Sequence, residues 1–153
     1  MTFVVLAPVA DTDLEDLIAL RIEAMRKSLE RIGRFDPARA GERLRSSFSA
    51  ACTRHILDSG QRVGFVVVKP QGDGLLLDHL YVHPAAQGRG IGAAVLALLF
   101  ADADRRGLSI QVGALKHSDS NRFYLRHGFM PTGEGEWDIY YVRPPVKNGD
   151  AAT

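Results

Sequence analysis

The sequence has little cysteine, no long apolar run and no export signal. Its single cysteine, Cys52 among 153 residues, can form neither an intrachain disulfide nor a multi-cysteine zinc site, so we expect a reducing compartment and no bound metal. The longest apolar run, residues 91–101, is too short to cross a bilayer. The apolar residues 3–7 follow no basic stretch and are too few for the core of a signal peptide. These absences predict a soluble, cytoplasmic protein without a membrane partner.

The chain also lacks an excess of charge of either sign. It has 19 Lys and Arg against 18 Asp and Glu, a formal net charge of +1, so no strong overall field attracts nucleic acid. Arg43, Arg45 and Arg54 are not interleaved with aromatic residues, as they would be on a nucleic-acid-binding surface. No repeat or linker divides the chain. We therefore expect one domain over residues 1–145, followed by a flexible tail at 146–153.

The spacing of apolar residues predicts a mixed α/β fold. Helical periodicity and capping residues predict four helices, and β-branched or aromatic runs between turn residues predict seven strands. The expected strands lie at 3–7, 55–57, 63–68, 75–82, 108–115, around 129 and at 137–142, and the expected helices at 14–31, from 37, at 90–106 and at 121–127. This order places antiparallel strands first and then one β-α-β crossover, so we expect a mixed, mostly antiparallel central sheet flanked by the helices.

The most informative absence is of carboxylates. No Asp or Glu occurs between Asp78 and Asp102, a segment in which a strand ends and Gly88, Gly90 and Gly92 lead into an apolar helix. Glycines let backbone N–H groups approach a ligand closely, and the N-terminus of a helix attracts anions. The segment therefore predicts a cradle for a phosphate or a pyrophosphate.

Two other interpretations of these glycines stay open. They can serve only tight packing, in a turn that binds nothing. The spacing Gly88-x-Gly90-x-x-Ala93 also satisfies a loose dinucleotide fingerprint. The late position in the chain, the four-residue insert before Gly88 and the absence of a ribose-binding carboxylate after the next strand, which is followed by Lys116, count against that fingerprint.

Three segments resemble one family. The hexapeptide 87–92 (QGRGIG) is similar to the Gln/Arg-x-x-Gly-x-Gly/Ala motif of the GNAT superfamily of acyl-CoA-dependent N-acetyltransferases. Residues 80–84 (LYVHP) resemble that family's fourth strand, and residues 122–129 (RFYLRHGF) resemble its helix-to-strand element. The resemblance covers residues 3–143 and implies the GNAT fold, with acetyl-CoA as cosubstrate.

In such proteins the pyrophosphate of acetyl-CoA lies on the backbone amides of the glycine turn, and the pantetheine arm pairs with the fourth strand. An N–H near Val82 would then polarise the thioester carbonyl. The family usually has an asparagine where this chain has Ser118, and Asn121 is the other candidate for that contact. The resemblance assigns to the cofactor Leu80, Tyr81, Val82, Gln87, Gly88, Arg89, Gly90, Ile91, Gly92, Ser118, Asn121 and Tyr124.

The resemblance implies a catalytic acid, and the alternation of the strand residues nominates a base. Tyr124 occupies the position of a tyrosine that protonates the departing thiolate; the alternative is a packing role in the core. Asp78, which shares a strand face with Leu80 and Val82, is our first candidate for the general base, followed by His79 and His117. Because Cys52 lies outside every motif, we expect direct attack by the amine in a ternary complex.

The acceptor is expected to be a small-molecule or peptide amine, and a homodimer is possible. The residues nominated to contact the acceptor are Met25, Arg26, Phe35, Glu134, Glu136, Trp137 and Tyr140. Two alternative functions remain: a non-catalytic module that binds acyl-CoA, and a dinucleotide-binding oxidoreductase.

Overall fold

The structure is a computed structural model that describes residues 3–31 and 33–147. Residues 148–153 of the expected tail lie outside the described residues. The elements are β1 (Val4–Pro8), α1 (Leu14–Arg31), α2 (Pro37–Ser47), β2 (Thr53–Asp58), β3 (Gln61–Gln71), β4 (Gly74–Val82), α3 (Ile91–Arg106), β5 (Ile110–Leu115), α4 (Ser120–Arg126), β6 (Met130–Glu134) and β7 (Asp138–Arg143). Short 3-10 turns lie at Asp11–Asp13, Ala50–Cys52 and Pro84–Ala86.

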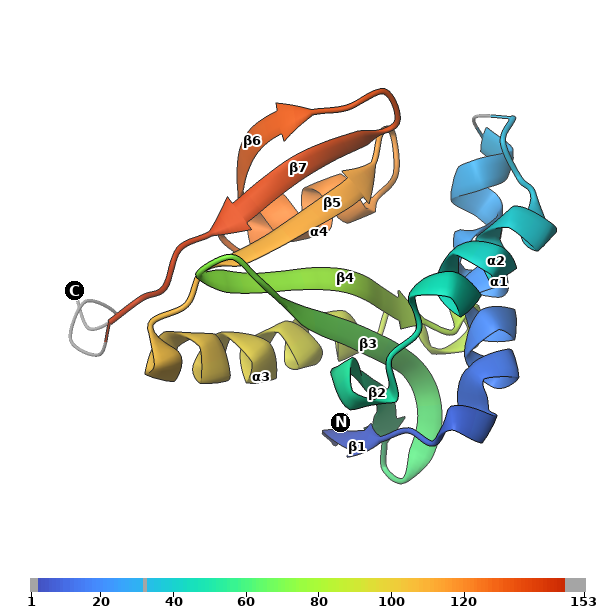
Figure 1. The fold of residues 1–153 in the computed structure, drawn as a ribbon, viewed down its shortest axis with the longest axis horizontal. Coiled ribbons are helices and arrows are strands. Elements are labelled where there is room, and N and C mark those ends of the chain that lie inside the picture. The colour runs from blue at the N-terminus through green and yellow to red at the C-terminus, as the bar shows by residue number, and fades with distance from the viewer. Residues whose placement is uncertain (1–2, 32, 148–153) are drawn as a thin grey trace. The chain divides into compact units, whose positions relative to one another are not determined.

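The strands form one sheet in the order β1-β2-β3-β4-β5-β7-β6 (Figure 1). β4 and β5 pair in parallel, whereas β1–β2, β2–β3, β5–β7 and β6–β7 pair antiparallel. The expected fold class, a mixed and mostly antiparallel seven-stranded sheet with four α-helices, is confirmed for the described residues. No helix in the described part of the chain is long and apolar enough to cross a membrane.

The chain divides into two compact units. The first contains the residues up to Val67 together with His79–Val95, and the second contains Val68–Asp78 together with the residues from Leu96 onward. Strands β3 and β4 and helix α3 each contribute residues to both units. The expectation of a single domain over residues 1–145 stays a prediction.

In the first unit, α1 and α2 lie side by side and cover the core (Figure 1). Leu17 and Ile18 of α1 pack with Leu44 of α2 against two β3 residues, Phe65 and Val67, and all of these side chains are buried. α2 begins where expected, because Asp36 caps the Arg39 amide at 3.1 Å and Pro37 follows as a first-turn residue. The apolar face of each helix thus fixes its position in this unit.

In the second unit, β7 lies between β5 and β6, and α4 packs on β5 (Figure 1). Arg143 of β7 forms a bidentate ion pair with Asp104 of α3, at 2.8 and 3.0 Å, and its guanidinium lies 3.9 Å from the centre of the Phe100 ring. Two carboxylate hydrogen bonds and an aromatic face fix the guanidinium of this nearly buried arginine in one orientation.

Most errors in the expected boundaries are at strand ends. β3 continues to Gln71 although the expected strand stops at residue 68, and the closing strand begins at Met130 rather than Phe129. In β3 the reason is the hairpin with its neighbour β4, because β3 continues to the turn at Gly72, which has a φ of +58°, and β4 begins at Gly74. Local residue preference underestimates strands that pairing lengthens.

Candidate functional site

The segment after β4 folds as a tight turn into α3. The His83 amide donates to the Val63 carbonyl at 2.7 Å, and a 3-10 turn at Pro84–Ala86 follows. Gly88 and Gly90 have φ values of +81° and +76°, in the left-handed region that favours glycine. A Cβ at either glycine would meet nothing within 4 Å among the described residues. Their conformation, rather than crowding, therefore requires glycine, and the space beside the backbone is open.

The N-terminus of α3 has features that favour a nearby anion. The Ala94 amide donates to the Gly90 carbonyl at 3.0 Å and closes the first helical turn, which contains no acidic residue. The buried side chains of Ile91 and Val95 anchor this turn. The amides at the start of a helix have no partner within the helix, and the helix dipole favours negative charge there. These features are compatible with the expected anion cradle, and anion binding there stays a prediction.

Close packing positions the end of β4 in the first unit. A Cβ placed on Gly64 of β3 would lie 2.1 Å from the Tyr81 carbonyl oxygen and 3.1 Å from Val82 Cα. Only a residue without a side chain allows this approach. The Gln87 side-chain amide in turn donates to the Val82 carbonyl at 3.0 Å, which joins the end of β4 to the glycine turn. Gly64 and Gln87 therefore fix where the strand meets the cradle.

A shallow, open hollow of about 430 Å³ lies beside this turn. Its lining residues are Gln61, Arg62, Val63, His83, Ala85, Ala86 and Arg89. We expected Arg89 to be available to the ligand, but its guanidinium lies 3.6 Å from Asp58 and its Nε donates to the Ala86 carbonyl. Because half of the side chain is exposed, the ion pair is loose and leaves Arg89 on the surface next to the hollow.

In the second unit, the polar residues expected to contact the cofactor are hydrogen bonded to one another. Ser118 Oγ donates to the Leu115 carbonyl at 2.7 Å, and Asn121 Nδ2 donates to the same carbonyl at 2.9 Å. The Tyr141 hydroxyl donates to Asn121 Oδ1 at 2.7 Å, and burial raises the pKa of this phenol. Ser118 and Asn121 therefore close the turn between β5 and α4, and their contact with coenzyme A stays a prediction.

Tyr124 lies on α4 and is buried. Its ring packs 5.2 Å from Phe129, edge to face, and 5.3 Å from Phe123, measured between ring centres. Tyr141 lies 6.3 Å away. This packing is what the alternative interpretation of Tyr124 requires, and its role as an acid stays a prediction.

The candidate bases have different surroundings. Asp78 lies in the second unit and forms an ion pair with Lys69 at 3.2 Å, so its carboxylate already contacts a cation. His79 lies in the first unit, where its buried ring packs 5.7 Å from Tyr81 and 6.4 Å from Phe65. His117 has a φ of +71°, which is rare for a residue with a side chain. None of the three roles is tested by this geometry.

Several of the nominated acceptor residues contact other side chains. Arg26 forms ion pairs with Glu23 and Glu30, and its guanidinium lies 4.5 Å from the centre of the Phe35 ring. Glu134 pairs with Lys116 at 3.0 Å, so its carboxylate already contacts a cation. Trp137, just before β7, and Tyr140, on β7, are both exposed. Met25 accepts a hydrogen bond from the Tyr81 hydroxyl.

Sequence reasoning missed two residues that stand out in the structure. Arg21 interrupts the apolar stripe of α1 and is buried, and an arginine at such a position is the signal that could have found it. Gly64 interrupts an apolar strand, which is a known sign of close backbone approach. Among residues 3–31 and 33–147 there is no cluster of three His, Cys, Asp or Glu side chains able to hold a metal ion.

Comparison with solved structures supports the fold. The PaiA N-acetyltransferase of Thermoplasma acidophilum, solved in complex with coenzyme A, matches with a TM-score of 0.76 and 16% identity, over 93% of this chain and 99% of that one. An acetyltransferase of Thermus thermophilus matches with a TM-score of 0.73 and 22% identity, over 92% of this chain and 96% of that one. A GNAT-family acetyltransferase of Bacillus cereus matches with a TM-score of 0.68 and 14% identity, over 95% of this chain and 99% of that one. Identities this low show the fold alone.

Comparison of sequences identifies the family. No curated protein matches the chain. The family model described as an acetyltransferase (GNAT) domain matches residues 50–131, more than half of the chain, including β4, the glycine turn, α3 and Tyr124. The chain therefore belongs to the GNAT acetyltransferase family.

Proposed function

We propose that the chain is an N-acetyltransferase that uses acetyl-CoA and transfers the acetyl group directly to an amine. The observation that carries the proposal is the glycine turn, whose open backbone and acid-free helix N-terminus fit a diphosphate. Family membership and the coenzyme A complex of the Thermoplasma protein support the choice of a CoA thioester among diphosphate ligands.

Each residue set has one role in this proposal. When bound, acetyl-CoA supplies an acetyl group activated as a thioester. Residues 87–92 hold its diphosphate through backbone amides. Leu80, Tyr81 and Val82, which lie beyond the β4 residues paired with β5 (Leu75–Leu77), present the strand edge to its arm. An amide near Val82 donates to the carbonyl oxygen, on which negative charge develops.

Proton transfers complete the reaction. The amine nitrogen forms the new bond to the carbonyl carbon, and the bond from that carbon to sulfur breaks. Tyr124 donates a proton to the leaving thiolate, and Asp78 accepts the proton that the amine loses. His79 and His117 are the alternative bases. No acyl-enzyme forms in this scheme, because Cys52 belongs to none of the proposed binding segments.

Calorimetry with acetyl-CoA on paired variants of one glycine tests the cradle. Gly92 lies in the first turn of α3, where a glutamate suits the helix dipole but repels a diphosphate. We expect micromolar affinity in the wild type and at least about tenfold weaker binding in Gly92→Glu than in Gly92→Gln, about 1.4 kcal/mol or more. Equal affinities of the two variants would remove the turn from the cofactor site.

Release of free thiol separates catalysis from binding. Incubation of the protein with acetyl-CoA and a mixed amine library should release coenzyme A and yield acetylated amines detectable by mass spectrometry. Binding of acetyl-CoA without thiol release from any amine would favour the non-catalytic acyl-CoA-binding module. Thermal stabilisation by NAD that coenzyme A does not reproduce would favour an oxidoreductase.

A further inference from the structure

Arg21 is a buried cation that forms no ion pair with a carboxylate among the described residues. Arg21 is 3% exposed, and one terminal nitrogen of its guanidinium donates to the Ala40 carbonyl of α2. The guanidinium carbon lies 5.9 Å from the centre of the Tyr81 ring. The Arg21 Nε–H has no hydrogen-bond partner in the described part of the chain. Buried polar groups are normally hydrogen bonded and buried charges normally paired. Arg21 therefore has a donor and a charge left for another group.

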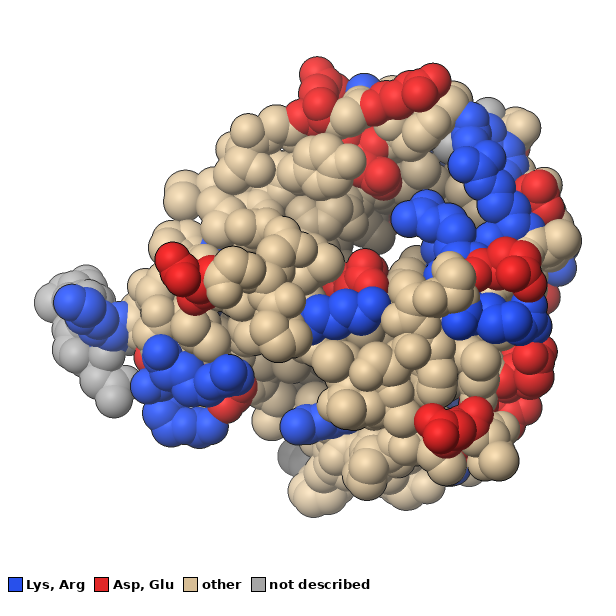
Figure 2. Space-filling view, in the orientation of Figure 1, with Lys and Arg blue, Asp and Glu red and all other residues tan. Residues whose placement is uncertain are grey.

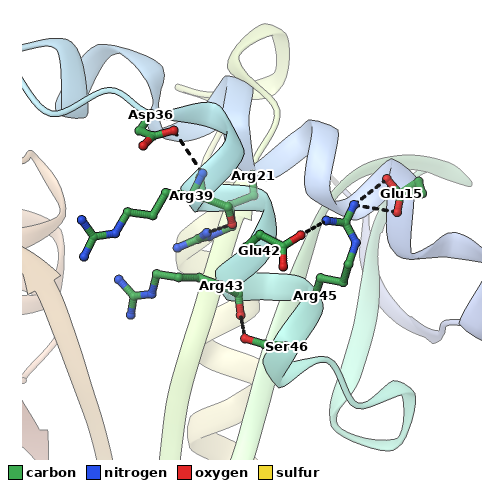
Figure 3. Close-up of polar contacts among 9 residues, drawn as sticks. Glu15, Arg21, Asp36, Arg39, Glu42, Arg43, Arg45 and Ser46 are labelled. Atoms are coloured by element: carbon green, nitrogen blue, oxygen red, sulfur yellow. Dashed lines mark hydrogen bonds and ion pairs between the residues drawn. The ribbon is translucent and has the colours of Figure 1, made fainter.

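Two further arginines lie beside it on α2. Arg39 and Arg43 are four residues apart, so they share one side of the helix. Figure 3 shows their side chains extending from the same side of α2 on which the Arg21 guanidinium lies. Both are exposed, and neither guanidinium has an acidic partner among the described residues. We call Arg21, Arg39 and Arg43 the arginine face.

The acidic residues of this region contact other groups. Arg45, on the opposite side of α2, lies 2.9 Å from Glu15 and 2.5 Å from Glu42 (Figure 3). Asp36 accepts from the Arg39 backbone amide. Figure 2 shows Lys and Arg side chains gathered over α1 and α2, interrupted by acidic patches. One side of α2 is thus neutralised, whereas like charges repel each other on the other side.

We propose that the arginine face binds a carboxylate or phosphate group of the acetyl acceptor, so that the substrate is an amine that carries an anionic group. This inference rests on the proposed function. Guanidinium groups bind both anions with paired hydrogen bonds, and the unused Arg21 Nε–H supplies a buried donor. Arg21 also lies against Tyr81, in the β4 segment assigned to acetyl-CoA, so an anion held there keeps the acceptor near that segment.

The first experiment measures anion binding without turnover. In ¹⁵N-labelled protein, the Nε–H signal of Arg21, assigned by its loss in Arg21→Lys, is followed during titration with inorganic phosphate or succinate, with sodium chloride as control. We expect a saturating shift in the millimolar range. The double variant Arg39→Gln/Arg43→Gln should weaken binding at least about tenfold, whereas Arg45→Gln, on the same helix, should not.

The outcomes of this titration are distinct. A stronger response to phosphate identifies a phosphate-bearing acceptor, and a stronger response to succinate identifies a carboxylate-bearing one. A shift no larger than that caused by chloride, or an equal shift in the double variant, overturns the inference. Neither result depends on acetyl transfer.

The second experiment measures substrate preference. Thiol release from acetyl-CoA is compared for phosphoethanolamine and ethanolamine, and for glycine and glycinamide. We expect the anionic member of at least one pair to have a kcat/KM about tenfold higher, with the preference lost in Arg39→Gln/Arg43→Gln and kept in Arg45→Gln. Equal or better use of the neutral amines overturns the inference and leaves the proposed function intact. Failure to bind acetyl-CoA overturns both.

Discussion

The two units differ in how some of their charged side chains are paired. In the first unit, Arg21, Arg39 and Arg43 have no acidic partner among the described residues, and the turn into α3 presents backbone amides without a carboxylate. In the second unit, Asp104 contacts Arg143 and Glu134 contacts Lys116. Unused donors and charges concentrate where a ligand binds, whereas paired groups hold a fold together. In our proposals these unpaired donors are the binding features of the first unit, which also contains ion pairs such as Arg45 with Glu15 and Arg26 with Glu23.

The largest expected effect comes from breaking the backbone contact in the first unit. In Gly64→Ala the new Cβ would lie 2.1 Å from the Tyr81 carbonyl oxygen, so β3 and β4 must separate. We expect a loss of about 3 kcal/mol or more in the free energy of unfolding, measured with urea. Gly133→Ala is the matched control, because its Cβ meets nothing within 4 Å in the described residues, and it should change stability by less than about 1 kcal/mol. Equal losses in the two variants would contradict the role of close packing.

Tyr124→Phe tests whether the second unit also contributes to the chemistry. If Tyr124 is the acid, the Tyr124→Phe variant should have a kcat lower by about 100-fold or more, with little change in its affinity for acetyl-CoA. The aromatic packing against Phe129 is kept in this variant. Wild-type turnover in the folded variant would assign Tyr124 to packing, and the contrast between the units would become sharper.

Part of the fold and of the candidate site could be predicted from sequence. The helices follow from the spacing of Leu17, Ile18 and their neighbours, and the turn into α3 follows from glycines and a missing carboxylate, because both signals are local. Partners remote in sequence leave no such signal. Asp78 lies nine residues from its partner Lys69, and Arg89 lies 31 residues from Asp58, so charge alone could not show that either group is paired.

A smaller effect is expected when the ion pair between Asp104 and Arg143 in the second unit is broken. Hydrogen bonds from Arg143 and from the Val146 amide hold the pKa of Asp104 below its ordinary value, against burial, which raises it. We expect Asp104→Asn to lose about 1 to 2 kcal/mol at pH 7, measured by urea unfolding. Asp102→Asn on the same helix breaks only exposed ion pairs and should lose less than about 0.5 kcal/mol.

The pH dependence of this difference has a defined sign. Because the pKa of Asp104 is lower in the folded state, its contribution is complete above the unfolded value of about 3.9. It is lost as the pH falls through the folded value. The stability difference between wild type and Asp104→Asn should therefore shrink in acid, and a difference that grows below pH 4 would contradict the ion pair.

The smallest expected effect concerns the turn after β5. His117 has a φ of +71°, so a residue with a Cβ is strained there. His117→Gly should be more stable than His117→Ala by about 0.5 to 1 kcal/mol in thermal unfolding, since both variants remove the imidazole and differ only at Cβ. A turnover that is lower than in the wild type by the same factor in both variants would favour His117 as the base. The reverse order of stability would show that the turn changes conformation in one of them.

The edge strand β6 influences how the protein behaves at high concentration. All five of its residues are exposed, and an open strand edge is a template for polymerisation into fibrils. Pro131 has no N–H to offer a neighbouring chain, and the register shift between Pro131 and Gly133 bends the strand out of the regular ladder. The same irregularity that makes this segment hard to recognise as a strand therefore protects the protein from self-association through that edge.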